Sequence, residues 1–326
     1  MCAVVAVAAG GCGSDQDQTA AVPGTTGTPR QRAVAAGHAF LRRYVDPDGR
    51  VVRRDQGGDT VSEGQAYAML VAVALNDRTT FDRVWGWTAK RLRRPDGLLS
   101  WHWAGGTVTD RQPSADADLD AAHALRLAAR RWRRPGLART ARAMADAMRG
   151  AEIRDGVVMA GPWATARGLT NPSYYDPRAL AALHMDDVAR ATRALVATVT
   201  AGGSRPPTDW ATLGPPAAPT SPPSGAGPPA YGYDAARVAI RLAASCDPDD
   251  RRIAANLTSL KTAAPARHPV FTVARAAVAH ARRDGAHSAD LLDQASAQDH
   301  AQPTYYGAAW VALGRLLLDT DLLGRC

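Results

Sequence analysis

Residues 62–70 read Ser62-Glu63-Gly64-Gln65-Ala66-Tyr67-Ala68-Met69-Leu70, an acid followed by small and apolar residues. Ser62 is a preferred residue for capping a helix, and Glu63 would lie in the first turn, near the positive end of the helix dipole. Small side chains at Gly64 and Ala66 would let a ligand or a neighbouring helix approach closely. The stretch predicts a buried helix that starts with a carboxylate. Taken alone, Glu63 is better explained as a first-turn acid that answers the helix dipole than as a functional residue.

The rest of the chain alternates between two kinds of helical pattern. Segments such as 61–76, 116–132 and 233–245 begin with acids or aromatics and continue with small apolar residues. Segments such as 79–93 and 137–149 are amphipathic and rich in Arg. This alternation is typical of inner helices packed on both sides and outer helices with one face in solvent. Helices are expected at residues 30–45, 61–76, 79–93, 116–132, 137–149, 176–185, 187–201, 233–245, 249–260, 268–283, 287–296 and 304–318.

Turn signals separate these segments, and no convincing run of alternating β-branched residues interrupts them. Asp247-Pro248 and Arg283-Asp284-Gly285 are two of these signals. Hydrophobic residues make up 46% of the 326 residues, which is enough for one large core. Twelve helices joined by turns predict an all-α helical toroid. An open solenoid of helix pairs is the alternative, although no fixed-period repeat supports it.

Residues 202–230 resist the helical interpretation because proline is too dense there. A loop of this length in a compact domain is usually functional or disordered. It leads directly into Asp234, so it either shapes the rim of a cleft or is a spacer. Asp209 and Trp210 are the part that we expect to be ordered.

The N-terminal residues predict an export signal rather than part of the fold. The short apolar run of residues 1–12 ends in small residues and Cys12, which resembles the end of a bacterial lipoprotein signal with Cys12 as the lipidated residue. The run lacks the basic region of an export signal, which suggests a translation start upstream of Met1. Residues 13–30 predict a flexible linker, 31–320 the folded domain and 321–326 a C-terminal tail. We expect a cell-surface or secreted protein that meets the membrane only through its lipid; a frayed N-terminus is the alternative.

Charge and cysteine content exclude several classes of protein. The net charge is +8, but the basic residues are nearly all Arg and are spread along the helical segments. Nucleic-acid binding needs a concentrated basic stripe or a known module, and neither is found. No Cys and His spacing suggests a zinc site, so no metal is expected. In an exported protein Cys246 and Cys326 would either pair or remain free thiols.

Three acids, Asp116, Asp118 and Asp120, follow one another at every second position before an apolar segment. On a helix Asp116 and Asp120 share a face, while Asp118 points elsewhere. Two acids at a helix start are a common capping pattern, but three acids without a nearby Lys repel one another and favour a functional site. Calcium is a rival interpretation. The calcium-loop pattern needs a Gly at its sixth position and a distal Glu, and both are missing.

A further carboxylate, Asp234, lies beside Tyr233 and is followed by Arg237 and Arg241 at helical spacing. A nearby Arg keeps a carboxylate ionised, as a general base requires; a structural ion pair is the alternative. Widely separated carboxylates among aromatics suit cleavage of a glycosidic bond. One acid protonates the leaving oxygen, one base activates water, and aromatic faces hold the sugar rings.

Aromatic residues are sparse, yet several lie next to these acidic segments. Four tryptophans within helical segments are expected in the core: Trp85, Trp87, Trp132 and Trp310. Four other aromatics are candidates for stacking on sugar rings: Trp101, Trp103, Trp210 and Tyr305.

Taken together and in order, segments between about residues 38 and 318 resemble glycoside hydrolase family 8. The resemblance implies an (α/α)6 barrel of six inner and six outer helices that cleaves β-1,4-linked glycans by an inverting, endo-acting mechanism. It places the general acid at Glu63, a sugar-binding and ring-distorting carboxylate at Asp116, and the general base at Asp234. The segments that carry it are Phe40 to Val51, Ser62 to Leu70, Asn76 to Trp87, Trp101-His102-Trp103, Ala115 to Asp120, Asn171-Pro172-Ser173-Tyr174, Asp209-Trp210, Tyr233 to Arg237 and Tyr305-Tyr306-Gly307.

The resemblance also implies a set of sugar-binding residues and a monomer without metal or cofactor. Some positions depart from the family pattern: Ala66 and Ala68 stand where glycines are usual, and the stretch from Arg237 to Arg241 lacks a tryptophan. These departures concern the identity of the glycan rather than the acids. The expected substrate-binding residues are Trp101, Trp103, Tyr174, Trp210, Tyr233, Arg237 and Tyr305.

The expected function is that of an exported endo-β-1,4-glucanase acting on a polysaccharide or oligosaccharide. A xylanase or chitosanase of the same family is one alternative, and a catalytically weak glycan-binding lipoprotein is another. A helical scaffold without a glycan role is disfavoured by the clustered acids. Comparing hydrolysis of different glycans separates these alternatives.

Overall fold

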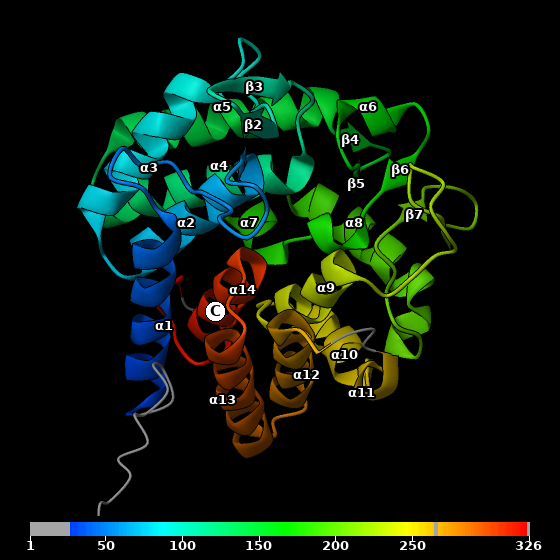
Figure 1. The fold of residues 1–326 in the computed structure, drawn as a ribbon. Helices are drawn as coiled ribbons and strands as arrows, with labels where there is room; N and C mark the ends of the chain where they lie inside the picture. The colour runs from blue at the N-terminus through cyan, green and yellow to red at the C-terminus, as the bar shows by residue number, and fades with distance from the viewer. Residues whose placement is uncertain (1–26, 264–266, 325–326) are drawn as a thin grey trace, which may run out of the picture.

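The computed structural model describes residues 27–263 and 267–324, and these residues fold mainly into helices (Figure 1). Twelve of the helices have six residues or more, and each corresponds to one of the helices expected from the sequence. Their bounds are α1 (Pro29–Tyr44), α2 (Ser62–Ala74), α3 (Arg78–Arg91), α4 (Ala115–Arg131), α5 (Pro135–Ala151), α7 (Pro177–Ala182), α8 (Asp186–Val199), α9 (Tyr233–Ala243), α10 (Pro248–Asn256), α12 (Pro269–Ala281), α13 (Gly285–Ala301) and α14 (Tyr305–Leu318).

The helices form an (α/α)6 barrel, as the sequence predicted. Helices α2, α4, α7, α9, α12 and α14 contact one another in a closed ring, because α14 returns to α2. Helix α1, which precedes α2, and the helices between the inner ones in sequence, α3, α5, α8, α10 and α13, pack around the outside of this ring. Helices α1 and α14, from the two ends of the chain, lie side by side (Figure 1). Closure of the ring excludes the open solenoid.

Burial follows the two kinds of helical pattern. Every residue of the inner helix α2 is buried except Glu63. On the outer helix α5, the buried residues Leu137, Ala141, Met144 and Met148 recur every three or four positions and leave the opposite face in solvent. Inner helices therefore need apolar residues all round, whereas outer helices need only one apolar stripe.

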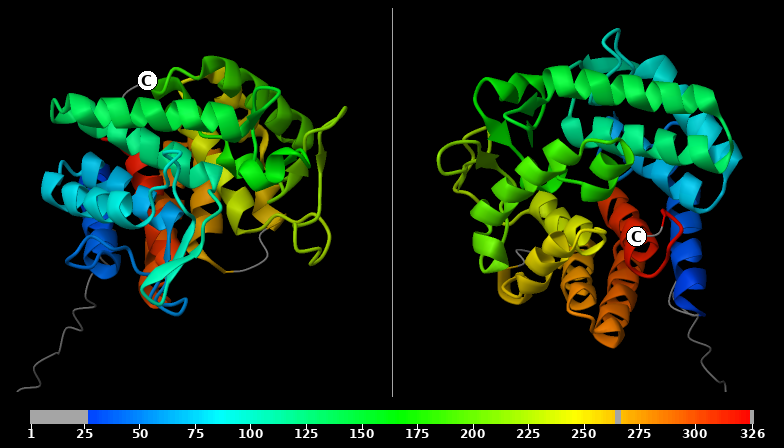
Figure 2. Two further views of the ribbon diagram at one scale, coloured as in Figure 1. Left: turned by 90° about the horizontal axis from the view of Figure 1, so that it is seen from above. Right: turned by 180° about the vertical axis from the view of Figure 1, so that it is seen from behind.

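Short elements connect the helices, and the sequence pattern had not indicated them. Strands β1, β2 and β3 form an antiparallel sheet in which Val61 pairs with His102. The β2–β3 hairpin projects beyond the helices in Figure 1 and in the right-hand view of Figure 2. Two- to four-residue strands are too short for an alternating pattern to appear. The strands are β1 (Thr60–Val61), β2 (His102–Ala104), β3 (Thr107–Asp110), β4 (Ile153–Arg154), β5 (Val157–Val158), β6 (Leu169–Thr170), β7 (Ala211–Thr212) and β8 (Ala218–Pro219).

Four very short helices complete the secondary structure of the described residues: α6 (Pro162–Thr165), η1 (Pro172–Tyr174), η2 (Ala201–Gly203) and α11 (Leu260–Ala263). The proline-rich segment 202–230 lacks long helices, as expected, and contributes β7 and β8. Its Asp209 is ordered, since the Asp209 side chain accepts a hydrogen bond from the Ala235 N–H. This part of the loop therefore serves the start of α9.

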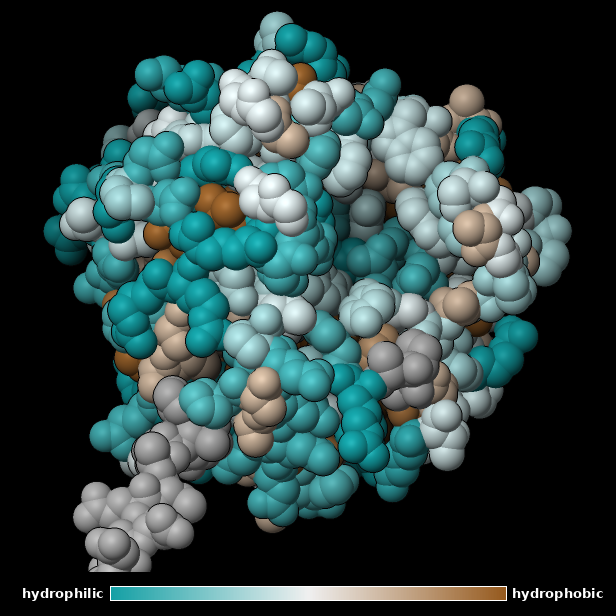
Figure 3. All heavy atoms as spheres, viewed as in Figure 1, coloured by the Kyte–Doolittle hydropathy of each residue, from teal (hydrophilic) through white to brown (hydrophobic). Residues whose placement is uncertain are grey.

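Hydrophilic side chains cover most of the face in Figure 3, and hydrophobic ones form only small separate spots there. Within the described ranges, no helix combines the length and the apolar character needed to cross a membrane. Cys246 is disulfide-bonded. Cys326, its partner in one of the two expectations, lies outside the described residues, as do Cys12 and nearly all of the linker 13–30.

Helices α12 and α14 cross closely at Gly314, where a Cβ atom would lie 2.4 Å from Val273 Cγ1. Valine cannot move this atom easily because its χ1 angle is stiff. We expect Gly314→Ala to lower the free energy of unfolding by about 1–3 kcal/mol, measured by denaturant titration.

Gly86→Ala is the matched control, because Gly86 is exposed on α3 and a Cβ there would meet nothing within 4 Å. Alanine favours the helix, so this change should stabilise the protein by about 0.5–1 kcal/mol. Equal effects of the two substitutions would contradict a tight α12–α14 crossing.

Candidate active site

One buried arginine, Arg237, connects the three carboxylates singled out in the sequence. Its Nη1 donates to Glu63 Oε2 at 3.0 Å and to Asp116 Oδ2 at 2.8 Å, and its Nη2 donates to Asp234 Oδ1 at 2.8 Å. Nη1 also donates to the Tyr67 hydroxyl at 2.9 Å. The arginine side chain is 1% exposed, whereas Glu63 and Asp234 are 21% and 33% exposed. A fully buried cation thus holds carboxylates that solvent can reach.

The barrel brings these groups together because each lies at the start of an inner helix. Glu63, Asp116 and Asp234 are each the second residue of their helix, in α2, α4 and α9. Inner helices of the ring start at the same end, so residues far apart in sequence meet there. Helix N-termini also carry partial positive charge, which favours carboxylates. The dipole explanation of these acids and their convergence at one site are therefore compatible.

Glu63 combines a raised pKa with contact to a neighbouring helix. Burial raises the pKa of Glu63 from 4.5 to about 7; Arg237 opposes this rise, while Asp116 and Asp234 add to it. The Tyr305 hydroxyl donates to Glu63 Oε1 at 3.4 Å. A Cβ at position 64 would lie 2.7 Å from this hydroxyl oxygen, so Gly64 allows the close approach. Near neutral pH the carboxyl group of Glu63 is protonated in a large fraction of molecules.

Asp234 is held by donors on both of its oxygens. Besides Arg237, the Asn171 amide donates to Asp234 Oδ2 at 2.8 Å, and both donors stabilise a negatively charged carboxylate. Asp209 lies behind it and accepts from the Ala235 N–H at 2.7 Å, which caps the start of α9 from a distant loop. Burial, and then the charge of Asp234, raise the pKa of Asp209 to about 6.

A second ion-pair layer lies one helical turn deeper. Arg241 donates to both oxygens of Asp120, at 2.9 and 2.7 Å, and to Asp176 Oδ2 at 2.5 Å. Arg241 and Asp120 each follow their counterpart in the upper layer, Arg237 and Asp116, by four residues. Burial raises the pKa of Asp120 to about 6 against the opposing effect of Arg241. The sequence placed Asp116 and Asp120 on one helix face, and this is confirmed.

Asp118 points away from both layers, as expected, and its Oδ1 accepts from the Leu99 N–H at 2.8 Å. It lies beside Glu152, and both side chains are fully buried. Burial raises the pKa of both carboxyl groups well above the ordinary range, and their contact adds to the rise for Glu152. The pair is accordingly a buried part of the core that supports the start of α4.

The expected sugar-binding aromatics divide into exposed and covered side chains. Tyr233 is 47% exposed and Trp101 36% exposed, so both present a ring to solvent. Trp103 is half-buried, with its ring packed edge-to-face on Trp87 at 5.5 Å and under the Arg50 guanidinium at 4.3 Å. Trp101 and Tyr233 are therefore better placed to stack on a sugar than Trp103.

Burial argues against the stacking expected of Tyr305, which is 1% exposed. Its ring packs edge-to-face on Tyr44, and only its hydroxyl group reaches the carboxylates. Tyr174 is also buried, and its hydroxyl lies 3.2 Å from Ser114 Oγ. Trp210 is half-buried and packs edge-to-face on Trp163 at 6.2 Å.

Several residues of the site escaped the sequence analysis. Trp163 is 37% exposed and forms an aromatic pair with Trp210. Asn171 and Tyr67 lay within quoted segments, but nothing in their spacing indicated that they bind Asp234 and Arg237. The proximity of Asn171 to a cluster of aromatics was the only signal. Trp163 stands alone in the sequence, and nothing in its sequence neighbourhood marks it as a residue of the site.

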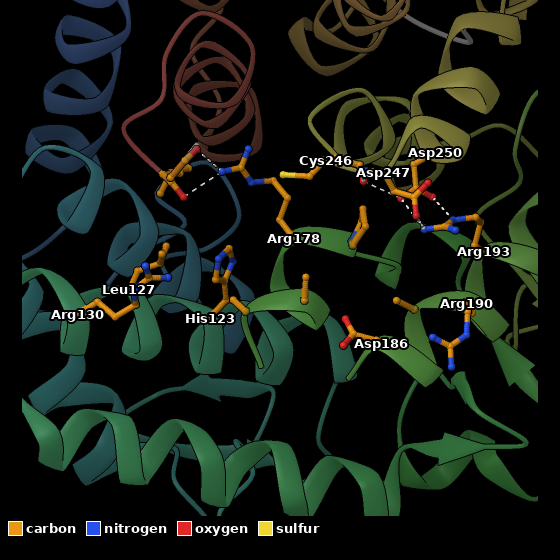
Figure 4. A pocket seen from close by; sticks show the side chains of 17 residues that line it. His123, Leu127, Arg130, Arg178, Asp186, Arg190, Arg193, Cys246, Asp247 and Asp250 are labelled. Carbon is orange, nitrogen blue, oxygen red and sulfur yellow. Dashed lines mark hydrogen bonds and ion pairs between the residues drawn. The ribbon is translucent and has the colours of Figure 1, made fainter. Parts of the chain in front are cut away.

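A cavity of about 580 Å³ lies away from the carboxylates (Figure 4). His123, Leu127 and Arg130 from the C-terminal half of α4 line it, while Asp116 lies at the N-terminus of that helix. Arg193 points into this region but is bound to Asp247 and Asp250. Among the residues described here, no group of three or more His, Cys, Asp or Glu side chains is arranged to hold a metal ion.

Carboxylates gathered among aromatics at one end of an (α/α)6 barrel form a site of the glycosidase kind. The family model for glycosyl hydrolases family 8 matches residues 21–305. The chain belongs to this family.

Relatives and solved structures agree with this assignment. A probable endoglucanase of Novacetimonas hansenii is 33% identical over 246 residues, which cover 67% of this chain and 69% of the relative. An endoglucanase of Cellulomonas uda is 37% identical over 108 residues, which cover 32% of this chain and only 30% of that protein. A β-1,3-1,4-glucanase from Paenibacillus sp. X4 has a TM-score of 0.78 at 17% identity, covering 90% of this chain and 93% of its own, and this likeness shows the fold.

The raised pKa of Glu63 predicts a pH-dependent stability. Because the pKa is about 7 in the folded protein and 4.5 ordinarily, the folded state binds the proton more tightly, and stability falls as the pH rises between these values. Glu63→Gln removes this ionisation. From pH 4.5 to pH 8, the free energy of unfolding of wild type should therefore fall by roughly 1–3 kcal/mol more than that of Glu63→Gln.

Denaturant titrations at the two pH values measure this difference. Asp290→Asn, at an exposed carboxylate of α13, is the control and should keep the pH dependence of wild type. A Glu63→Gln variant that loses stability with pH just as wild type does would contradict a raised pKa at Glu63.

Proposed function

We propose that the protein is an endo-acting β-1,4-glucanase that hydrolyses its substrate with inversion. The observation that carries the proposal is the binding of Glu63, Asp116 and Asp234 to one buried guanidinium, that of Arg237, with two of the carboxylates open to solvent. Membership of the family and the endoglucanase relatives support the substrate class.

Glu63 acts as the general acid in this proposal. Its pKa of about 7 keeps a proton available near neutral pH, and this proton passes to the glycosidic oxygen as the bond from that oxygen to the sugar C1 breaks. Asp234 takes a proton from a water molecule, whose oxygen bonds to C1 from the opposite face of the ring. The proton from water ends on Asp234. The fragment on the reducing-end side of the cleaved bond keeps the glycosidic oxygen and leaves with the proton from Glu63.

Arg237 suits this exchange because it binds both carboxylates at once. Before the reaction the negative charge lies on Asp234, and afterwards it lies on Glu63. Each oxygen concerned is about 3 Å from the same guanidinium, so the charge keeps its counterion throughout. Asp116, held by Nη1 and by the Ser114 hydroxyl, is positioned to bind the distorted sugar ring.

We expect Glu63→Gln and Asp234→Asn each to lower the turnover of carboxymethyl cellulose by at least ~10²-fold, because each removes one proton-transfer group. Reducing-sugar release measures turnover, and NMR of the first product measures its anomeric form. Inversion requires that the β-linkage yields the α-anomer first. A β-anomer, or turnover within threefold of wild type for Glu63→Gln, would falsify the assignment.

The same assay on xylan, chitosan and β-1,3-1,4-glucan separates the alternative substrates. Faster release from one of these than from cellulose would identify a different glycanase of the family. Binding of cello-oligosaccharides without any hydrolysis would identify the weakly catalytic glycan-binding protein instead.

We further propose that the protein is exported and anchored by lipid on Cys12. The motif at residues 1–12 supports this proposal. Expressed from its natural gene, the protein should partition into the detergent phase, and Cys12→Ser should move it to the aqueous phase, since acyl chains supply the membrane affinity. Cys2→Ser is the control and should leave the partition unchanged. Detergent partition that persists in Cys12→Ser would exclude this anchor.

A further inference from the structure

The backbone of Trp101 is tied to the start of the helix that carries Glu63. The Trp101 carbonyl oxygen accepts from the Ser62 N–H at 2.9 Å, and Ser62 directly precedes Glu63. The Trp101 N–H donates to the Gln112 carbonyl oxygen at 3.0 Å. Both polar groups of this backbone unit are therefore bonded, and they hold Trp101 beside the start of α2.

The side chain of Trp101 is held by the ring of its neighbour, His102. The two rings stack with their centroids 4.8 Å apart and their planes inclined by 24°. The stack covers one face of the indole, yet Trp101 is still 36% exposed. An indole that is backed on one face can receive a flat apolar ligand surface on the other.

Hydrogen bonds at both ring nitrogens fix the plane of His102. Its Nε2 lies 2.8 Å from Asp59 Oδ2, and its Nδ1 lies 2.7 Å from the Thr109 hydroxyl. Asp59 is itself fixed, because Arg53 Nε and Nη2 donate to its two oxygens in a two-point contact. The imidazole cannot rotate without breaking these bonds, so the ring on which Trp101 rests has one orientation.

A backing ring of this kind favours binding without touching the ligand. Stacking of a sugar on an indole buries apolar area, which favours association. Ordering a mobile side chain in the same step costs conformational entropy and weakens binding. A side chain that is already ordered in the free protein avoids this cost.

We propose that His102 is a positioning residue for substrate binding: it holds the Trp101 ring in the orientation in which a pyranose ring of a β-1,4-linked oligosaccharide stacks on it. This inference rests on the proposed function, which supplies the glycan as the ligand. His102 acts through Trp101 and makes no hydrogen bond to the three carboxylates. It therefore affects the affinity for substrate more than the chemical step.

Calorimetric titration with cellohexaose tests this inference, in a Glu63→Gln background that keeps the ligand intact. We expect His102→Ala to raise the Kd by about 2- to 10-fold, because the ligand must then order the Trp101 side chain. Trp101→Ala should raise it further. The double variant should bind no more weakly than Trp101→Ala alone, since without the indole His102 has nothing to position.

Tyr233 provides the matched comparison. Its exposed ring packs against other aromatic rings, those of His268 and Phe271, at centroid distances of 5.0 and 5.3 Å. The losses of affinity from His102→Ala and Tyr233→Ala should therefore multiply, as they do for independent sites. His287→Ala, at an exposed histidine of α13, should leave the Kd unchanged.

Thr109→Val is a milder variant for the case in which His102→Ala disturbs the hairpin. It removes only the partner of Nδ1, at an exposed position, and should give a smaller loss that also vanishes in Trp101→Ala. Losses that multiply between His102→Ala and Trp101→Ala would overturn the inference, because His102 would then act independently of the indole. Wild-type protein that does not bind cellohexaose would overturn it as well.

Kinetics separate this inference from the proposed function. With Glu63 intact, His102→Ala should raise the KM for cellohexaose in step with the Kd and keep kcat within about twofold of wild type. A purely structural role would instead lower the apparent kcat through loss of folded enzyme, with KM unchanged. If wild type binds cellohexaose without hydrolysing it and the Kd pattern holds, the inference stands and the hydrolase function fails. Hydrolysis with Kd and KM unmoved in His102→Ala would overturn the inference alone.

Discussion

The arrangement of the site depends on the burial of one charge, the guanidinium of Arg237. Moving such a group out of water is costly, and the cost is offset only when carboxylates and other acceptors surround it. Asp116 meets this need from within the barrel, and Glu63 and Asp234 meet it from the solvent side. The positions of the three acids are therefore a consequence of the same electrostatic requirement that lets the arginine lie between the inner helices.

The second layer shows how this requirement specifies the register of the helices. Arg237 and Arg241 on α9 face Asp116 and Asp120 on α4, and the two residues on each helix are four positions apart. Sliding either helix by one residue would break both contacts together, because residues four apart share a helix face. Apolar packing tolerates small shifts better than buried ion pairs do. The two layers consequently align the helix starts that carry the acids.

Much of the fold was predictable because helical periodicity is a local signal. The twelve helices of six residues or more follow from which residues are apolar and how often they recur. The same pattern distinguished inner helices such as α2 from outer helices such as α5. The three acids were also found, since they occur at helix starts. The β1–β2–β3 sheet, the Asp209 cap and the Asp59 contacts were not predicted. Each joins residues that are distant in sequence, and no local pattern encodes such a contact.

The sequence by itself determined the helices, their amphipathic faces and the acids at their N-termini, because these depend on neighbours within a few residues. Only the tertiary structure decided which acids share a counterion, which aromatic rings face solvent and which are buried. Tyr305 and Trp101 illustrate the difference: both looked suited to stacking, but Tyr305 is enclosed by α1 while Trp101 remains exposed. Burial depends on what the closed ring of helices brings against each side chain, and that is a property of the whole barrel.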